Sequence, residues 1–482
     1  MAKIHFIQDN IVNESLGILH LSSYLKANGH SVQLSLLSQY RSVKALLLDI
    51  EKSAPDIIGF SVMTPQADTY ESVSHAIKQN IQLPIIWGGA HCTFMPEVVA
   101  KNNDVDIICI GEGEESLLEL MNRLESHEDY STISGLWVLR DGVRVRNGLR
   151  MLESNLDKYP FPDRALLYEQ SALLRRFKMK RFLVQRGCPF GCNYCFEPML
   201  QEMYRGKGRL VRSHSVEYAI AEIKDLISKY PARFIHFSDD SINLNWEWLF
   251  HFLKSYREEV KVPFSCNVVV PLLREDVVIA LKEAGCEGVV FGVESGVERI
   301  RKEILRKQVS DEQYLHAAAL LHKHGIKITT NTLLCVPTER LADSLATIEF
   351  CSRLRVHRIS MNILKIYRGT KLAELSLKNG WAADKGRYTL NSKDIFNEHE
   401  SIKNLAWLGF FFMRMPFLIR FAKQLVTWRH IRVFSFLILL TYWQEITWFK
   451  ISILQAFVYF LSSRRLFLAG MGGEQEDKSE QV

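Results

Sequence analysis

Three cysteines in one short segment constrain this chain more than any other feature of its sequence. The segment Arg186–Phe196 reads Arg-Gly-Cys-Pro-Phe-Gly-Cys-Asn-Tyr-Cys-Phe, so Cys188, Cys192 and Cys195 stand at C-x3-C-x2-C spacing. Its glycines and proline favour a tight loop that gathers the sulfur atoms at one point. Three thiolates can hold three irons of a [4Fe-4S] cluster and leave the fourth iron open to another ligand. We therefore predict that these cysteines are metal ligands at a catalytic centre.

A structural zinc loop is the alternative for the same spacing. Zinc needs a fourth close ligand, and the next histidine, His214, lies well beyond the usual distance along the chain. The cluster is therefore favoured. The other cysteines stand in apolar surroundings and are expected to be small buried hydrophobic residues. They are Cys92, Cys109, Cys266, Cys286, Cys335 and Cys351.

The cysteine spacing resembles the signature of the radical SAM superfamily. In that family the open iron binds the amino and carboxylate groups of S-adenosylmethionine (SAM), and reductive cleavage of SAM gives a 5′-deoxyadenosyl radical. The resemblance implies SAM as a cofactor and an electron donor such as flavodoxin or ferredoxin as a partner. Nine cysteines without an N-terminal apolar signal segment predict a reducing, cytoplasmic location.

Short β-rich runs alternate with segments of helical length in the first part of the chain. This alternation predicts an α/β domain of flavodoxin-like or Rossmann type, with helices on both faces of an open parallel sheet. Ligands of such sheets bind at the carboxyl ends of the strands. The expected strands are 3–6, 32–36, 56–61, 83–87 and 106–110.

The loops after these strands carry the candidate ligand contacts. The stretches 59–64, 88–91 and 110–114 look like the loops of the cobalamin-binding domain that precedes many radical SAM modules, and the resemblance covers residues 1–130. It implies cobalamin as a third cofactor. The motif Asp-x-His-x-x-Gly does not occur in this half, so no lower cobalt ligand is expected from it. The implied cobalamin-binding residues are Ser61, Thr64, Gly88, Gly89, His91, Gly111, Glu112 and Gly113, although His91 is also compatible with a plain hydrogen-bonding role in its loop.

A hairpin at 135–145 and a proline-containing linker at 155–164 make up an expected connecting region, 131–175. From residue 176 to 385 the alternation resumes, and six β/α repeats predict a partial (β/α)6 TIM barrel that is open on one side. The expected strands are 182–185, 234–238, 264–269, 288–292, 327–334 and 358–364, with helices at 216–228, 275–284, 310–323 and 342–354.

Polar residues follow several of these barrel strands. Asp239 and Asp240 are candidates to accept hydrogen bonds from the ammonium of SAM, with an N-cap or turn role as the alternative. The stretch 292–296 closely resembles the family motif Gly-x-Glu-Ser-Gly. The resemblance implies that Glu294 or Ser295 binds the ribose of SAM and that Gly292 and Gly296 leave room for the nucleoside.

Two further features of the barrel sequence bear on the SAM site. Lys307 follows the Gly-x-Glu-Ser-Gly motif and is expected to be a solvated surface charge rather than a contact of the SAM carboxylate. In 334–339, Cys335 and Thr338 stand where relatives usually have the glycines of Gly-x-Pro-Gly-Glu. Cys335 is expected to be a packed thiol.

The composition changes in the region 386–470, where apolar and aromatic stretches are interrupted by lysine and arginine. Glu445 is the lone acidic residue between Ser401 and Gly470. The pattern predicts an all-α extension of basic amphipathic helices that lie on an anionic inner membrane face or cover an apolar substrate pocket. A plain helical subdomain with a solvated basic face is the alternative. The tail 471–482 is expected to be disordered, and no motif indicates nucleic-acid binding.

The resemblance implies an enzyme, and methyl transfer is the best-populated activity of the cobalamin-binding group. The leading hypothesis is therefore a methyltransferase acting on an unactivated carbon of a small apolar substrate, either lipid-like or a tetrapyrrole. A cyclase, ring-contraction or oxidation enzyme with the same cofactors is the first alternative. A membrane-associated, metal- or cobalamin-binding protein without catalytic activity is the second.

Overall fold

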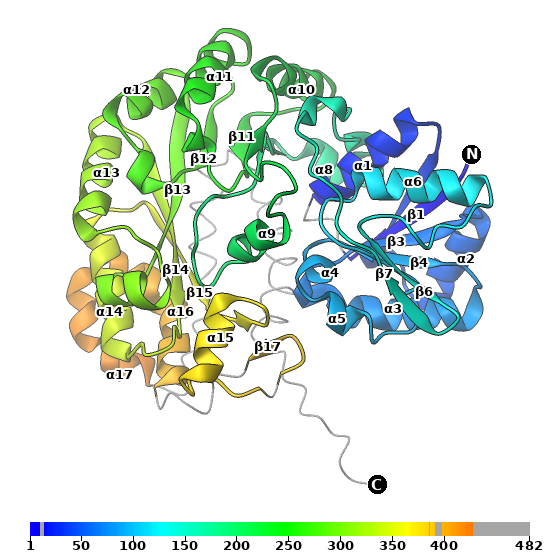
Figure 1. Ribbon diagram of the computed structural model, residues 1–482. Coiled ribbons are helices and arrows are strands. Elements are labelled where there is room, and N and C mark those ends of the chain that lie inside the picture. Colours follow the sequence, from blue (N-terminus) through cyan, green and yellow to red (C-terminus); the bar gives the residue numbers. More distant parts are fainter. Residues whose placement is uncertain (10–13, 385, 391–397, 428–482) are drawn as a thin grey trace. The chain divides into compact units, whose positions relative to one another are not determined.

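The computed structural model describes residues 1–9, 14–384, 386–390 and 398–427 (Figure 1). These residues form two compact units. The first unit contains 1–176 and 203–208, and the second contains 177–202 together with the described residues from 209 onward. The short segment 203–208 therefore belongs to the first unit although it interrupts the second in sequence.

The first unit is built on a seven-stranded sheet with the order β2-β1-β3-β4-β5-β6-β7. Strands β1 to β5 are parallel, which confirms the predicted α/β domain, and the hairpin β6–β7 extends the same sheet antiparallel to β5. Isoleucines along β1, β3, β4 and β5 are fully buried, as expected for strands covered on both faces. The strands are β1 (Lys3–Gln8), β2 (Ser31–Leu36), β3 (Ile57–Ser61), β4 (Ile85–Gly88), β5 (Ile107–Cys109), β6 (Leu136–Arg140) and β7 (Val143–Arg146).

The helices of the first unit connect these strands and cover the sheet (Figure 1). They are α1 (Leu16–Ala27), α2 (Val43–Ser53), α3 (Ala67–Asn80), α4 (Ala90–Phe94), α5 (Pro96–Val99), α6 (Glu114–Glu125), α7 (Arg164–Tyr168) and α8 (Ala172–Arg176). Helix α1 ends before Gly29, whose φ of +86° is a left-handed conformation that glycine adopts without strain.

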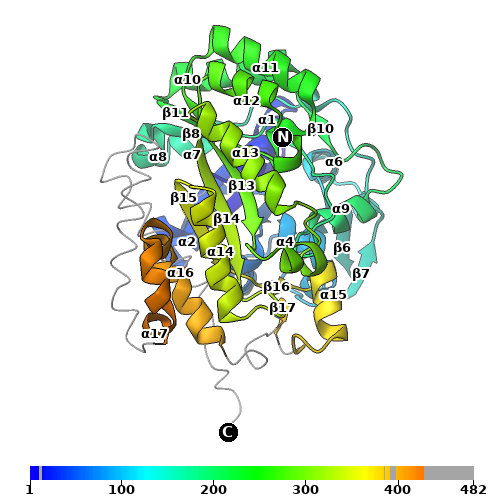
Figure 2. The same ribbon diagram turned by 90° about the vertical axis from the view of Figure 1, so that its left-hand side faces the viewer.

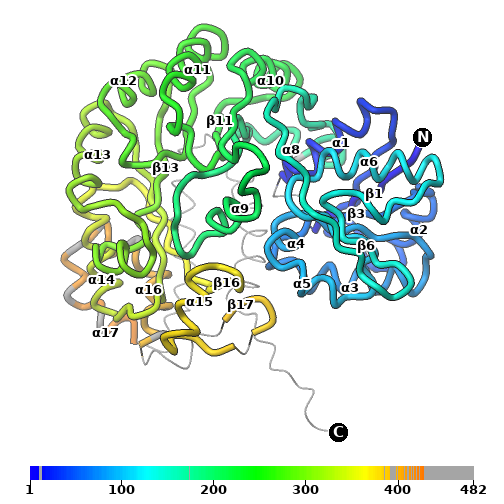
Figure 3. Tube along the Cα trace, in the orientation of Figure 1, coloured from blue at the N-terminus to red at the C-terminus, as the bar shows by residue number. Residues whose placement is uncertain are grey.

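The second unit is a curved, all-parallel sheet of six strands in the order β15-β14-β13-β12-β11-β8. This arrangement confirms the predicted partial barrel. Helices α10 to α14 follow one another along the outer side of the sheet (Figures 1 and 2), and the trace runs through the repeats in order from green to yellow (Figure 3). The strands are β8 (Met179–Phe182), β11 (Phe234–Phe237), β12 (Phe264–Asn267), β13 (Cys286–Glu294), β14 (Lys327–Leu334) and β15 (Arg358–Ile363).

The helices of the second unit include one directly after the cysteine loop, α9 (Glu197–Met203). The others on the barrel are α10 (Val216–Lys229), α11 (Trp246–Glu259), α12 (Glu275–Glu283), α13 (Asp311–Lys323) and α14 (Leu341–Arg353), with a π-helix, η6 (Ile300–Ile304), between β13 and α13. π-Helical turns are rare and occur frequently at functional sites.

The first barrel strand lies earlier in the sequence than 182–185. Strand β8 ends at Phe182, and β9 (Gln185–Arg186) instead pairs antiparallel with β10 (Arg212–Ser213). The Asp239 side chain explains the break. Its Oδ1 accepts hydrogen bonds from the amides of Val184 and Gln185 at 2.7 and 2.6 Å, so these amides are not used in the barrel ladder.

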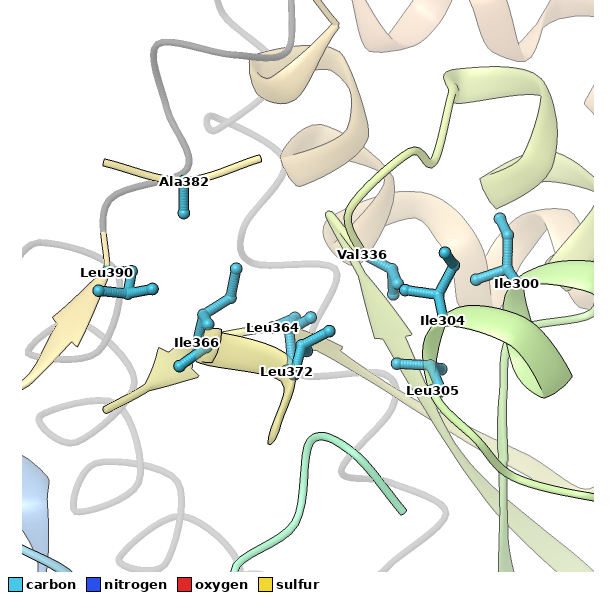
Figure 4. Close-up of a cluster of buried hydrophobic side chains, with 10 residues drawn as sticks. Ile300, Ile304, Leu305, Val336, Leu364, Ile366, Leu372, Ala382 and Leu390 are labelled. Carbon is cyan, nitrogen blue, oxygen red and sulfur yellow. The ribbon is translucent and has the colours of Figure 1, made fainter. Parts of the chain in front are cut away.

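A buried apolar cluster closes the end of the barrel sheet and connects it to the segment that follows (Figure 4). This segment contains β16 (Ile366–Tyr367), α15 (Lys371–Lys378) and β17 (Thr389–Leu390). The cluster consists of Ile300, Ile304, Leu305, Val336, Leu364, Ile366, Leu372, Ala373, Ala382 and Leu390. It fixes η6 against the end of β14.

The described part of the C-terminal region is helical, with α16 (His399–Arg414), the 3-10 turn η7 (Pro416–Phe421) and α17 (Ala422–Val426). The apolar stretches 433–440 and 451–461 and the tail 471–482 lie outside the described residues. Within the part of the chain that the structure describes, every helix is too short or too polar to cross a membrane.

Candidate active site

The three cysteines of the sequence motif line one cavity of about 580 Å³ in the second unit. All three are free thiols. Helix α9 holds their loop, because the Gln201 side chain donates to the carbonyl of Cys188 at 2.9 Å and Glu197 accepts from the Cys188 amide at 3.0 Å. The protein's own hydrogen bonds therefore hold the conformation of the cysteine loop.

The chemistry of these thiols fits a site completed by metal. Burial raises the pKa of Cys188 to about 12 and that of Cys195 to about 11, and it also raises the pKa of Cys192. Without a metal they are therefore protonated near neutral pH, and metal binding would release their protons. A half-buried, unbridged set of three thiols in one cavity is the donor set that a cluster with one open iron requires.

A single zinc ion would need closer sulfurs than three irons do. Zn–S bonds of about 2.3 Å in a tetrahedron place the sulfurs about 3.8 Å apart. Among the described residues, no three His, Cys, Asp or Glu side chains converge on one ion in this way. A cubane instead distributes its thiolates over separate irons.

The two adjacent aspartates after β11 have different surroundings. Asp240 lines the cavity with its side chain exposed there, and partial desolvation by the cavity wall raises its pKa. Asp239 does not line it. Its side chain faces the end of β8, it is 1% exposed, and burial raises its pKa to about 7. Of the predicted pair, the structure therefore places only Asp240 beside the cysteines.

Glu294 sits at the carboxyl end of β13 and forms a small network with two neighbours. Its Oε1 accepts from the Tyr194 hydroxyl at 2.9 Å and pairs with Lys307 Nζ at 3.0 Å. Tyr194 stands between Cys192 and Cys195, so the network joins the cysteine loop to the strand end. All three members line the cavity.

Lys307 is therefore not the solvated surface charge that the sequence predicts. Its side chain is 20% exposed. Burial alone would lower the pKa of Lys307, but the attractions of Glu294, Tyr314 and Cys192 together outweigh burial and raise it. Nothing in the local sequence indicates this burial, since the contact with Glu294 depends on how the segment after η6 folds back. Ser295, by contrast, is fully buried and does not line the cavity.

Both motif glycines leave room for other parts of the protein, and Gly292 also lines the cavity. A Cβ at Gly292 would lie 1.8 Å from Glu294 Oε1, so this glycine leaves space for the Glu294 and Lys307 side chains. A Cβ at Gly296 would lie 2.6 Å from the Thr347 Cα, so this one allows α14 to pack closely.

Two residues after β14, Cys335 and Thr338, replace glycines of the family motif and have the backbone conformation that glycine usually adopts. Cys335 has φ +62° and Thr338 has φ +70°, both in the left-handed region. The substitutions thus preserve the turn at the cost of backbone strain. Cys335 is 2% exposed, as expected for a packed thiol.

In the first unit, the loops after β3 and β4 are tied together at the carboxyl edge of the sheet. Gly89 has φ +90°, and a Cβ there would lie 2.9 Å from the Val62 amide. His91 is 1% exposed, with Nδ1 3.2 Å from Thr64 Oγ1. Ser61 and Gly88 are paired neighbours in the sheet. The candidate residues of these two loops thus form one continuous edge.

The loop after β5 completes this edge and has a partner that the sequence did not indicate. The amide of Glu112 donates to the Tyr204 hydroxyl at 3.1 Å, and a Cβ at Gly111 would overlap that hydroxyl. Gly113 lies close to Cys109. Tyr204 comes from the segment 203–208, far away in sequence, and no local pattern marks it as part of this site.

Comparison with known proteins identifies a family for each unit. Residues 182–351 match the radical SAM superfamily, and residues 12–121 match the B12 binding domain. The matches confirm the predicted pairing of domains and the predicted set of cofactors: a [4Fe-4S] cluster, SAM and cobalamin.

Two sequence relatives and one solved structure are similar to this chain, the structure in its fold. An uncharacterised methyltransferase of Pyrococcus horikoshii is 29% identical over 76% of this chain and 78% of its own. The anaerobic magnesium-protoporphyrin IX monomethyl ester cyclase of Rubrivivax gelatinosus is 25% identical over 64% of this chain, and the match spans 56% of the relative's length. The cobalamin-dependent SAM radical enzyme OxsB, solved with aqua-cobalamin bound, has a TM-score of 0.71 at 16% identity, covering 98% of this chain and 80% of its own.

Proposed function

We propose that this chain, which belongs to the cobalamin-binding enzymes of the radical SAM superfamily, is a methyltransferase that acts on an unactivated carbon. The observation that carries the proposal is the single cavity in which three free thiols face the carboxylates of Asp240 and Glu294. A B12 binding domain in the same chain supports a methyl carrier in addition to the radical centre. The name of the Pyrococcus horikoshii relative supports methyl transfer as the outcome.

Each part of the cavity has a task in this reaction. When bound, the cluster and cobalamin supply an electron for SAM cleavage and a carrier for the methyl group. Cys188, Cys192 and Cys195 hold the cluster, and the Asp240 carboxylate binds the ammonium of SAM. The Glu294 carboxylate, oriented by Lys307, accepts hydrogen bonds from the ribose.

Part of the cavity wall is apolar and limits the access of water. It includes Val268, Val269, Val270, Phe291 and Val309. Exclusion of water protects a reactive carbon radical from side reactions and strengthens the electrostatic contacts of the charged residues.

The test is anaerobic turnover of the reconstituted full-length protein with cobalamin, a reductant and SAM carrying a deuterated methyl group. Candidate substrates are lipid and tetrapyrrole extracts. The proposal expects 5′-deoxyadenosine and a labelled product. If neither forms while iron, sulfide and cobalamin are all present, the methyltransferase proposal is wrong.

A cyclase or oxidation reaction with the same cofactors is the second candidate. The Rubrivivax gelatinosus cyclase among the relatives favours it. Such a reaction gives 5′-deoxyadenosine but no labelled methyl group in the product. The product mass therefore separates the two candidates.

We also propose that the substrate is apolar and reaches the enzyme at an anionic membrane face in the cytoplasm. Large apolar side chains are exposed on η7 and α17, with Phe417 59% and Phe421 43% exposed. The sequence 401–470 around them contains one acidic residue, Glu445, among many basic ones. Apolar residues within a basic segment suit binding to anionic lipids.

Sedimentation with lipid vesicles tests this contact. Binding should be stronger to anionic than to neutral vesicles and should weaken with salt. The double variant Phe417→Asp, Phe421→Asp should bind less while its cluster content is unchanged. Equal sedimentation of both proteins would remove the membrane proposal without affecting the methyltransferase proposal.

A further inference from the structure

A fully buried arginine lies behind the cavity wall that carries Glu294 and Lys307. Arg301 belongs to the π-helix η6, and its side chain is 0% exposed. A buried guanidinium is tolerated only when its charge and its donors are matched by partners. The partners of Arg301 therefore indicate which parts of the chain it holds in place.

The Arg301 guanidinium donates to two backbone carbonyls that flank the charged pair. Nη1 donates to the carbonyl of Ser295 at 2.6 Å, and Nε donates to the carbonyl of Val309 at 2.9 Å. Ser295 directly follows Glu294, and Val309 lies two positions after Lys307. The planar guanidinium of Arg301 thus connects the end of β13, which carries Glu294, to the loop that carries Lys307.

Further contacts fix the guanidinium itself. Its Nη2 pairs with Asp311, the first residue of α13, and lies 3.6 Å from Glu298. Its Cζ is 5.1 Å from the ring centroid of Tyr314, whose hydroxyl donates to the carbonyl of Gly292 at 2.7 Å. A lysine at this position has a point charge without the planar fork and cannot reproduce the set.

The conformation that this set maintains is strained. Glu294 has φ +63°, a left-handed conformation that residues other than glycine keep only where their surroundings over-determine it. The hydrogen bond from Arg301 to the Ser295 carbonyl is one contact that holds Glu294 in this conformation. Loss of the contact would let the turn relax and move the Glu294 carboxylate relative to Lys307.

We propose that Arg301 is a positioning residue that fixes Glu294 and Lys307 in the cavity wall and so sets the affinity of this site for SAM, a positively charged sulfonium nucleoside, without touching it. The proposal rests on the proposed function, which places SAM in this cavity. Glu294 and Lys307 line the cavity that would hold SAM, whereas Arg301 does not line it and only fixes their positions.

The experiment compares two arginine-to-lysine variants of the full-length, anaerobically reconstituted protein. Arg301→Lys removes the guanidinium that donates to the carbonyls of Ser295 and Val309. Arg144→Lys is the matched control, because Arg144 in the first unit also donates to backbone carbonyls, those of Val105 and Asp106, at 2.9 to 3.0 Å. SAM binding is measured by calorimetry without turnover, alongside iron content, sulfide content and Tm.

Arg301→Lys should raise the Kd for SAM about tenfold while iron and sulfide stay at the wild-type level. In uncoupled 5′-deoxyadenosine formation, the KM for SAM should rise while kcat at saturating SAM changes less than about threefold. Arg144→Lys should leave the Kd within about twofold of wild type. Should Arg301→Lys fail to fold, Asp311→Asn removes one partner of the guanidinium and should raise the Kd about threefold.

An unchanged Kd in both Arg301→Lys and Asp311→Asn would overturn the role of Arg301, as would an equal loss in Arg144→Lys. A wild-type protein that binds no SAM would overturn this inference together with the proposed function. Wild-type binding of SAM without methyl transfer would count against the methyltransferase proposal only.

Discussion

Asp239 is buried at the end of β8, whereas its neighbour Asp240 lines the cavity. The substitution Asp239→Asn tests how the burial of the Asp239 carboxyl affects the stability of the protein. The substitution keeps an oxygen that accepts from the amides of Val184 and Gln185 and removes the ionisable proton. Burial raises the pKa of Asp239 from its ordinary 3.8 to about 7. The folded protein therefore binds this proton more tightly than the unfolded chain does.

The sign of the effect follows from that difference in proton binding. The contribution of Asp239 to the free energy of unfolding is complete below about pH 4 and is lost as the pH rises to about 7. The difference between a pKa of 3.8 and one of about 7 corresponds to about 4 kcal/mol in the free energy of unfolding. Above about pH 7 the wild-type protein carries this full cost, whereas Asp239→Asn does not ionise and avoids it.

At about pH 8 the Asp239→Asn variant should be more stable than wild type by about 1–3 kcal/mol, because a buried amide N–H without a partner offsets part of the 4 kcal/mol. At about pH 5 this advantage should be absent, since wild-type Asp239 is then protonated. Urea unfolding followed by tryptophan fluorescence, at equal cluster content, measures both differences. The same difference between variant and wild type at both pH values would refute the assignment.

Asp240→Asn is the matched control for SAM binding. It should raise the Kd for SAM about tenfold, whereas Asp239→Asn should change it less than about threefold. An equal increase of the Kd for SAM in both variants would mean that the Asp239 side chain also contacts SAM.

Three further substitutions test other parts of the site. Cys192→Ala should abolish cluster assembly and leave cobalamin bound, as measured by iron and sulfide analysis with a visible spectrum; retention of a full cluster would show that Cys192 is not a ligand. Gly111→Ala should reduce cobalamin binding at least about tenfold in a spectral titration, because its Cβ would overlap the Tyr204 hydroxyl and its φ is +82°. Tyr194→Phe removes the hydroxyl that donates to Glu294 and should raise the KM for SAM about threefold to tenfold; an unchanged KM would count against the network.

The sequence was sufficient for the architecture because its signals are local. Alternating β-rich and helical segments gave the parallel sheets of both units, and the cysteine spacing located the cavity. The end of the first barrel strand was misplaced, because it depends on the Asp239 side chain that reaches Val184 and Gln185 from a different repeat.

The side chains around the candidate site were harder to predict than its location. Lys307 has the sequence surroundings of a surface lysine, and only the folded position of Glu294 explains its burial. Gly292 matches a family motif, yet the space it leaves is filled by the protein's own carboxylate. Tyr204 reaches Glu112 from a point 92 positions away in sequence. Such long-range contacts leave no trace in local periodicity.

The segment 203–208 determines when the first unit can finish folding as the chain is synthesised. Lys207 accepts from the Leu152 amide at 2.8 Å and donates to the Leu149 carbonyl at 3.2 Å, while Tyr204 braces the loop after β5. The first unit therefore cannot finish folding when residue 176 leaves the ribosome. It must wait until the cysteine loop and α9 have also emerged, so a fragment that stops at 176 would lack the Tyr204 contact with the loop after β5.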